Sequence, residues 1–178
     1  MANFVIVDGL VGAPSPVTAT DSVQKWPLGY IARGIDYNSA TGNTGSTNCG
    51  AGMFVYCAGS NVSSSGQWCS IVNGTAVIAT GARPGPVGVA AADGLTATSV
   101  YGWVQVQGKL DYGKGTNTAI STNQALYLGS IVGVAHSASV DGGFIAGAVC
   151  ATSYATTNSN SAHYFLQFPA VLGSSAAM

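Results

Sequence analysis

The stretch SVYGWVQVQGKL, residues 99–110, is the most informative part of the chain about its fold. Its residues alternate, with glycine and valine at one parity and aromatic or amide side chains at the other: Tyr101, Trp103, Gln105 and Gln107. A period of two predicts a β-strand with two different faces. Two interpretations of the aromatic and amide face follow. It contacts a partner, or it belongs to the core of a sandwich that is packed on both sides.

The composition around this stretch predicts an all-β protein. The chain has 178 residues, which suits one domain, or one domain with an arm. Only 6% of the residues are charged, against about 25% in an ordinary soluble protein, and all six acidic residues are Asp. Helices use Glu and Lys on their exposed faces. Here Ser, Thr, Asn, Gln and 25 Gly must supply the polar surface, which favours strands and turns.

Short segments with β character recur from Tyr30 onward, separated by Gly, Asn or Ser. Their close spacing, without a convincing helix, predicts a sandwich or small barrel of short antiparallel strands. Residues 29–178 are therefore expected to form a single β domain. The predicted strands are 29–35, 53–58, 67–72, 76–80, 87–92, 99–108, 124–128, 131–135, 144–153 and 163–168.

Residues 1–28 differ from the rest and predict an extended N-terminal arm. Phe4 to Val7 could form a short strand, and Pro14 and Pro16 favour extended backbone. An arm of this kind lies on a surface or, alternatively, is disordered. A monomer would bury the arm's large apolar side chains with difficulty, so we expect these to contact a partner protein: Phe4, Ile6 and Trp26.

The charge pattern argues against nucleic acid and membrane partners. The formal charge is −1, and the five Lys and Arg residues are scattered, whereas phosphate contacts need clustered cations. No apolar run approaches the ~20 residues that span a bilayer. The first ten residues lack the basic region of a signal peptide, so synthesis in a cytoplasm is expected.

Four cysteines, Cys49, Cys57, Cys69 and Cys150, follow neither a CxxC nor a zinc-finger spacing. Cys57 and Cys69 lie in apolar segments, where buried free thiols are common. We therefore predict buried thiols, with a disulfide or a metal site as the alternatives.

Catalytic patterns are weak, and the sequence predicts neither an enzyme nor a cofactor. His136 or His163 could be combined with Ser130, Asp93 or Asp141, but no GxSxG motif accompanies them.

The segment GKLDYGKG, residues 108–115, matches most of a P-loop. It places Gly115 where Ser or Thr must bind magnesium, and no helix is expected after it. We interpret it as a hairpin turn.

Five segments in order carry a resemblance to a known group of proteins: GPVGVAAAD (85–93), YGWVQVQGK (101–109), ALYLGSIVGVA (125–135), GGFIAGAV (142–149) and FLQFPAV (165–171). Together with WPLGYIARG and MFVYCAG earlier in the chain, this order resembles the head decoration, or cement, proteins of tailed phages. The likeness covers most of residues 25–171, and YGWVQVQG is its most distinctive part. The loop 36–52 and the cysteines are not part of it.

The resemblance implies a β-rich structural protein on the outer surface of the virion capsid, commonly a homo-oligomer and often a trimer. Its partner would be the major capsid protein, bound where capsid subunits meet and opposing the pressure of the packaged DNA. No catalytic or cofactor-binding residue carries over. The interface residues expected from the sequence are Phe4, Ile6, Trp26, Tyr101, Trp103, Gln105 and Gln107.

The alternative function is that of a head-fibre or tail-appendage module that recognises a receptor or a carbohydrate. Trp68, Trp103 and the loop 36–52 would then form an aromatic platform with polar neighbours.

Overall fold

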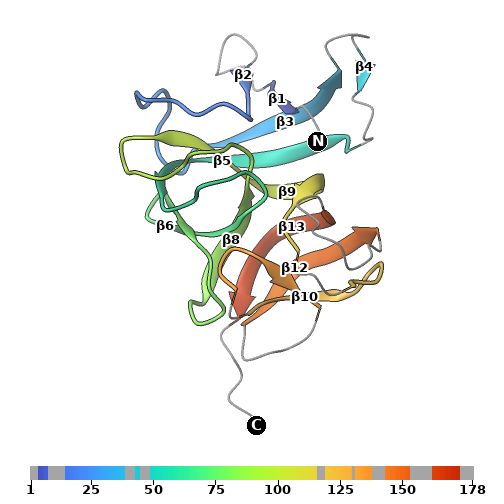
Figure 1. Cartoon of the computed structure of the whole chain (residues 1–178). Coiled ribbons are helices and arrows are strands. Elements are labelled where there is room, and N and C mark those ends of the chain that lie inside the picture. The colour runs from blue at the N-terminus through green and yellow to red at the C-terminus, as the bar shows by residue number, and fades with distance from the viewer. Residues whose placement is uncertain are drawn as a thin grey trace.

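The computed structural model describes residues 4–7, 15–38, 43–44, 49–115, 119–129, 131–137, 143–152 and 162–172, which form strands and no helix (Figure 1). The all-β prediction is confirmed. The strands are β1 (Phe4–Ile6), β2 (Ser15–Pro16), β3 (Ile31–Asn38), β4 (Asn43–Thr44), β5 (Ala51–Ser60), β6 (Trp68–Val72), β7 (Thr75–Ile78), β8 (Gly85–Ala90), β9 (Tyr101–Gly113), β10 (Ala125–Leu128), β11 (Ala135–His136), β12 (Gly143–Thr152) and β13 (Ala162–Leu172).

Five of these strands close into a small barrel. β5 pairs with β7, β7 with β6, β6 with β8, β8 with β9, and β9 again with β5. The β5–β7 pair is parallel, which the expectation of antiparallel strands did not include. The closed ring is visible around β5, β6 and β8 in Figure 1.

Small apolar side chains fill the barrel, since five strands enclose little space. At Gly88 even a Cβ atom would lie 2.6 Å from a methyl carbon of Val104 and 2.7 Å from the carbonyl oxygen of Gln105. Along each strand alternate residues point into this interior, so the sequence alternation reflects inside and outside. The buried interior residues are Val55, Cys57, Val62, Cys69, Ala76, Ala90, Leu95, Val104 and Val106.

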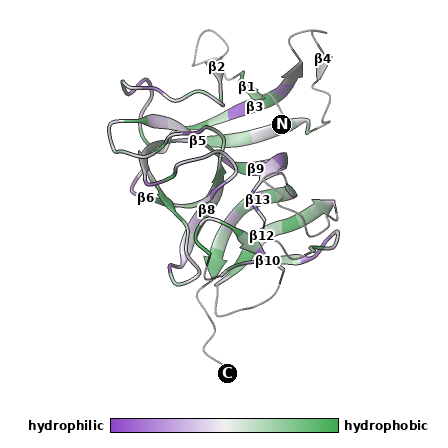
Figure 2. Cartoon of the chain, viewed as in Figure 1, coloured by the Kyte–Doolittle hydropathy of each residue, from purple (hydrophilic) through white to green (hydrophobic). Residues whose placement is uncertain are grey.

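A second and larger apolar cluster covers the outside of the barrel. β3, β1 and β2 extend the sheet from β5, while β13, β12, β10 and β11 extend it from β9. In Figure 2, β12 and β13 are largely green, which marks their apolar residues. β9 therefore has core on both faces, with Trp103 and Val104 both 1% exposed or less.

β9 is longer than the sequence predicted, and the expected hairpin turn at residues 108–115 is wrong. Gly108 adopts a φ of +97°, which only glycine accepts readily, and it bends the strand without ending it. Beyond that point β9 changes partner: Leu110 pairs with Tyr164, and Gly113 pairs with Ala162, both on β13.

The predicted strand at residues 131–135 is also largely wrong. Gly133 has a φ of +70°, accepts a hydrogen bond from the Trp68 amide and donates one to the Ala79 carbonyl. These bonds hold Ile131 to Gly133 as a turn against the barrel, and only Ala135 and His136 pair as β11. The other predicted strands are present, with ends that differ by a few residues.

The N-terminal segment is extended, but its described part belongs to the sheet of this same chain. β1 pairs with β3 and with β2. Phe4 and Ile6 are 0% and 1% exposed, and the Phe4 ring packs edge-on against Phe54 at 5.1 Å. The prediction that Phe4 and Ile6 contact a partner is therefore wrong, because both side chains are buried in the core of this chain.

All four cysteines are buried thiols outside any disulfide, so the prediction of buried thiols is confirmed. Removal from water raises the pKa of the Cys57 thiol to about 12, and it raises the pKa of Cys69 strongly, because a thiolate is poorly solvated there. Both sulfur atoms lie in the barrel interior. They are packing residues and not nucleophiles.

Candidate functional site

The aromatic residues of the opening stretch belong to an internal cluster. The Trp103 ring lies 5.0 Å from Tyr56 and 5.1 Å from Trp26. Trp26 is half-buried, because it closes this cluster from the outside and meets Tyr56 edge-on at 4.9 Å. Tyr101 stacks on Tyr56. For Trp103 the core interpretation is correct and the partner interpretation is wrong, while Trp26 and Tyr101 keep part of their surface.

Gln105 is fully buried, so its predicted role at an interface is also wrong. Its amide nitrogen donates to the carbonyl oxygens of Gln107 and Lys109, each at 3.2 Å, on both sides of the Gly108 bend. Its amide oxygen accepts a hydrogen bond from the Tyr112 hydroxyl at 2.5 Å. Gln105 thus satisfies two main-chain carbonyls beside the bend and ties the two parts of β9 together.

The outer face of β12 and β13 is the largest departure from an ordinary protein surface. Antiparallel sheets commonly have polar side chains on the face that water contacts. Here four large apolar side chains from the two strands are 38–53% exposed. We call them the apolar patch: Phe144, Phe165, Phe168 and Leu172.

Cross-strand pairing relates three members of the patch to their neighbours on the sheet. Phe144 lies directly opposite Leu172, and Val149 lies opposite Phe165. The neighbouring strand β10 adds Tyr127, whose ring contacts that of Phe144 at 5.6 Å. Lys109 on β9, opposite Phe165, brings a positive charge to the edge of this face.

Phe168 is held in an unfavourable backbone conformation. Its φ is +47°, in the left-handed region that costs a residue with a side chain about 1–2 kcal/mol. The conformation arises where β13 stops pairing with β9, at Gln167, and begins pairing with β8, at Ala170. The ring is 53% exposed, so this strain is not offset by burial within the chain. Strain of this kind points to a function in contact with something else.

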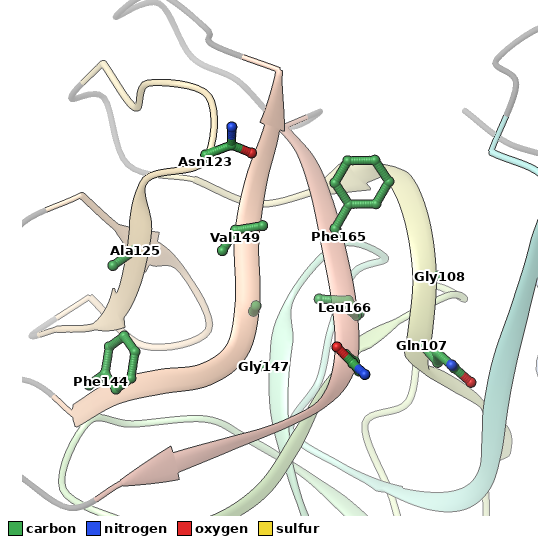
Figure 3. A pocket seen from close by; sticks show the side chains of 11 residues that line it. Gln107, Gly108, Asn123, Ala125, Phe144, Gly147, Val149, Phe165 and Leu166 are labelled. Atoms are coloured by element: carbon green, nitrogen blue, oxygen red, sulfur yellow. The ribbon is translucent and has the colours of Figure 1, made fainter.

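A groove of about 490 Å³ crosses the same sheet face beside the patch. Figure 3 shows Phe144 and Phe165 on either side of Val149, with Asn123 at one end and Gln107 at the other. Gly147, with a φ of +75°, leaves the floor open because it has no side chain. The groove is thus built by irregularities in β9 and β12, the two strands that flank β13.

The sequence prediction therefore missed the outer face of β12 and β13. Only some of the predicted interface residues keep an exposed surface. Gln107 is half-buried and lines the groove, and its predicted contact with a partner stays a prediction. The signal that was available is the segment HYFLQFPAVL, which carries apolar residues at both parities. That pattern predicts a strand whose two faces are both covered.

The aromatic platform of the alternative function does not exist as predicted. Trp68 is 0% exposed and Trp103 is 1% exposed, so neither ring can meet a ligand. Of the loop 36–52, residues 39–42 and 45–48 lie outside the described residues, and Asn43 and Thr44 form β4 against β3.

The residues considered for catalysis are not brought together among those described. Asp93 accepts a hydrogen bond from the Ser65 amide at 2.6 Å, which is a turn contact. His136 is 9% exposed, and its Nε2 atom has no hydrogen-bond partner. Ser130 and Asp141 lie outside the described residues.

We predict that His136 makes the protein less stable in mild acid. Burial lowers the pKa of His136 below its ordinary 6.5. As the pH falls below about 6.5, the unfolded chain therefore binds a proton before the folded chain does, so the free energy of unfolding decreases. Denaturant unfolding of the wild type and of His136→Asn at pH 7.5 and 5.5 measures the effect. The substitution should reduce the loss at pH 5.5; an equal loss in both proteins would contradict the prediction.

Two further features bear on the kind of site. In the part of the chain that the structure describes, no three His, Cys, Asp or Glu side chains gather closely enough to hold a metal ion. The same residues contain no helix that is long and apolar enough to cross a membrane. Comparison with protein-family models, with curated proteins and with solved structures found no match for this chain.

Proposed function

We propose that this chain is a structural protein of a phage virion that attaches to the outer face of the head and stabilises it. The observation that carries the proposal is the apolar patch on the outer face of β12 and β13. Apolar side chains gathered on one face of a soluble protein mark surfaces that are covered in an assembly. The resemblance to decoration proteins supplies the identity of the partner, the major capsid protein.

The chemistry of the patch suits attachment to a protein surface. Interface cores are depleted of charge and enriched in aromatic residues, because a charged group must be desolvated when the surfaces meet. Phe144, Phe165 and Phe168 supply rings, and Leu172 extends them toward the end of β13. Each attached copy adds about 25 cal/mol per Å² of buried apolar surface, and many copies on one shell add their contributions.

The proposal includes self-association of the attached protein, as a trimer. With 6% charged residues, neighbouring copies repel one another weakly, which favours crowding on a shell. In this proposal the chain is made in the host cytoplasm and acts on the capsid exterior without catalysis.

Attachment should depend on the apolar patch. We expect the double variant Phe168→Gly, Leu172→Ser to bind phage heads at least about tenfold more weakly, because interface anchors of this kind contribute about 2 kcal/mol or more. Glycine at position 168 also relieves the strain of the left-handed backbone conformation, so this change in the backbone should not lower the thermal stability of the variant. Co-sedimentation with heads assembled without this protein gives the affinity.

The matched control is Val23→Ser, which removes an apolar side chain that is 72% exposed and lies outside β12 and β13. It should attach like the wild type. A folded double variant that sediments with heads as strongly as the wild type would refute attachment through this face.

A further inference from the structure

The groove beside the apolar patch is lined by both aromatic rings and side-chain amides. Attachment through the patch would require only the apolar groups. Its walls include the rings of Phe144 and Phe165, and its rim carries the side-chain amides of Gln107, Asn123 and Gln167. Among the described residues, none of these three amides has a hydrogen-bond partner within the protein. None of the residues that line the groove is charged.

We propose that this groove binds a neutral oligosaccharide. A sugar ring presents a face of C–H groups, which packs on an aromatic ring, and an edge of hydroxyl groups, each of which both donates and accepts a hydrogen bond. A carboxamide also has a donor and an acceptor, so it matches a hydroxyl in either direction. No charged side chain lines this groove, and the cations Lys109 and Arg33 lie outside its lining, so an anionic ligand would find no ionic partner within it. A purely apolar ligand would strip the three amides of water.

The backbone sets the point from which each of these side chains starts. Gln107 stands opposite Gln167 in the β9–β13 pair, so two of the amides start from adjacent points on neighbouring strands. The side-chain amide of Gln105 donates a hydrogen bond to the main-chain carbonyl of Gln107. Asn123, at the far end, has a φ of +62°, and its amide nitrogen in the main chain donates to Cys150 at 2.8 Å. The side-chain amides therefore start from defined points along the groove and are free to turn toward a ligand.

The groove's size and surroundings favour a chain of several sugars over a single one. Its volume of about 490 Å³ is typical of pockets that hold a small ligand. A second hollow of about 200 Å³ continues on the other side of Gln107 and Gly108 and reaches Arg33. An extended ligand can therefore cross Gln107 from one hollow into the next.

Nuclear magnetic resonance tests the inference directly, because the side-chain amides of Gln107, Asn123 and Gln167 each give their own signals. The ¹⁵N-labelled chain is titrated with neutral hexasaccharides of glucose, N-acetylglucosamine, galactose and mannose, and with the corresponding disaccharides. At least one hexasaccharide should shift these amide signals in a saturable manner, and its disaccharide should bind more weakly.

Gln107→Leu with Gln167→Leu should then weaken binding of that hexasaccharide by at least about tenfold, because each lost hydrogen bond leaves a sugar hydroxyl unpaired. If the double variant does not fold, Gln107→Met alone is used, since this side chain is only half-buried. Leu172→Ser, outside the groove lining, should bind the sugar like the wild type.

Sugar binding is a different property from attachment to a capsid, and the two are decided by different results. If no hexasaccharide shifts the three amides at millimolar concentration, the groove is not a neutral sugar site. If phage heads alone shift them, the groove belongs to the protein interface and the sugar inference is overturned, while the attachment proposal stands. The leucine variants should still attach to heads.

Discussion

Replacement of Trp103 by alanine should lower the free energy of unfolding by about 3–5 kcal/mol, the usual cost of removing a large aromatic side chain from a core. Trp103 is 1% exposed, and its ring contacts those of Trp26, Tyr56 and Tyr30 at centroid distances of 5.1, 5.0 and 6.5 Å. The substitution leaves a cavity between the barrel and the segment that carries Trp26. Unfolding in urea, followed by circular dichroism, measures the loss.

Gln107→Ala is the matched control for this substitution. Gln107 occurs on the same strand, at the same parity in the sequence, but its side chain is half-buried and lines the groove. Its replacement should change the free energy of unfolding by no more than about 0.5 kcal/mol, as is usual for surface positions. If Trp103→Ala were equally mild, the aromatic face of β9 would not be core, and the partner interpretation of that face would have to be restored.

Gly66→Ala should be about as damaging, by a different mechanism. Gly66 has a φ of +80°, and an added Cβ atom would overlap the carbonyl oxygen of Tyr112. The backbone cannot move away easily, because Gly66 donates to the Ala90 carbonyl and accepts from the Lys114 amide, each at 2.8 Å. The left-handed backbone and the steric overlap together should cost about 3–5 kcal/mol.

Gly94→Ala separates these two contributions. Gly94 has nearly the same backbone angle, a φ of +82°, but nothing lies within 4 Å of its Cβ position. We therefore expect a cost of about 1–2 kcal/mol from the backbone alone. Thermal and denaturant unfolding of both variants gives the difference, which measures the steric overlap at Gly66. Equal losses in the two variants would show that the contact with Tyr112 yields without cost.

The individual strands could be predicted because alternation is a local property. The apolar residues Val55 and Cys57, and likewise Val104 and Val106, alternate with their neighbours in sequence, and this alternation predicts a strand. Closure of the barrel could not be predicted in the same way. It depends on the parallel pairing of β5 with β7 and on β9 pairing with three different strands, β5, β8 and β13. These pairings join residues that are far apart in the chain, and they leave no local signal.

The candidate site could be predicted only in part, because buried clusters and protein interfaces use the same side chains. Trp103 on β9 and Trp26 in the arm were each expected to contact a partner, yet Trp26 covers Trp103 within this chain. Charged residues usually distinguish the solvent-exposed face of a strand from its buried face. This chain has too few of them to make that distinction. Phe168 shows the limit most clearly. Its positive φ results from the change of partner along β13, and nothing in the residues around it specifies that change.

The bend at Gly108 also has a consequence for synthesis on the ribosome. The part of β9 before the bend finds β5 already made, but Lys109 to Gly113 must wait until β13 has been translated. During that interval the backbone of Lys109 to Gly113 has no strand to pair with on the β13 side. Unpaired strand edges of this kind aggregate with other nascent chains. The charges of β9 are confined to this half, at Lys109 and Asp111. We expect these two charges to keep the unpaired edge soluble until β13 has been made.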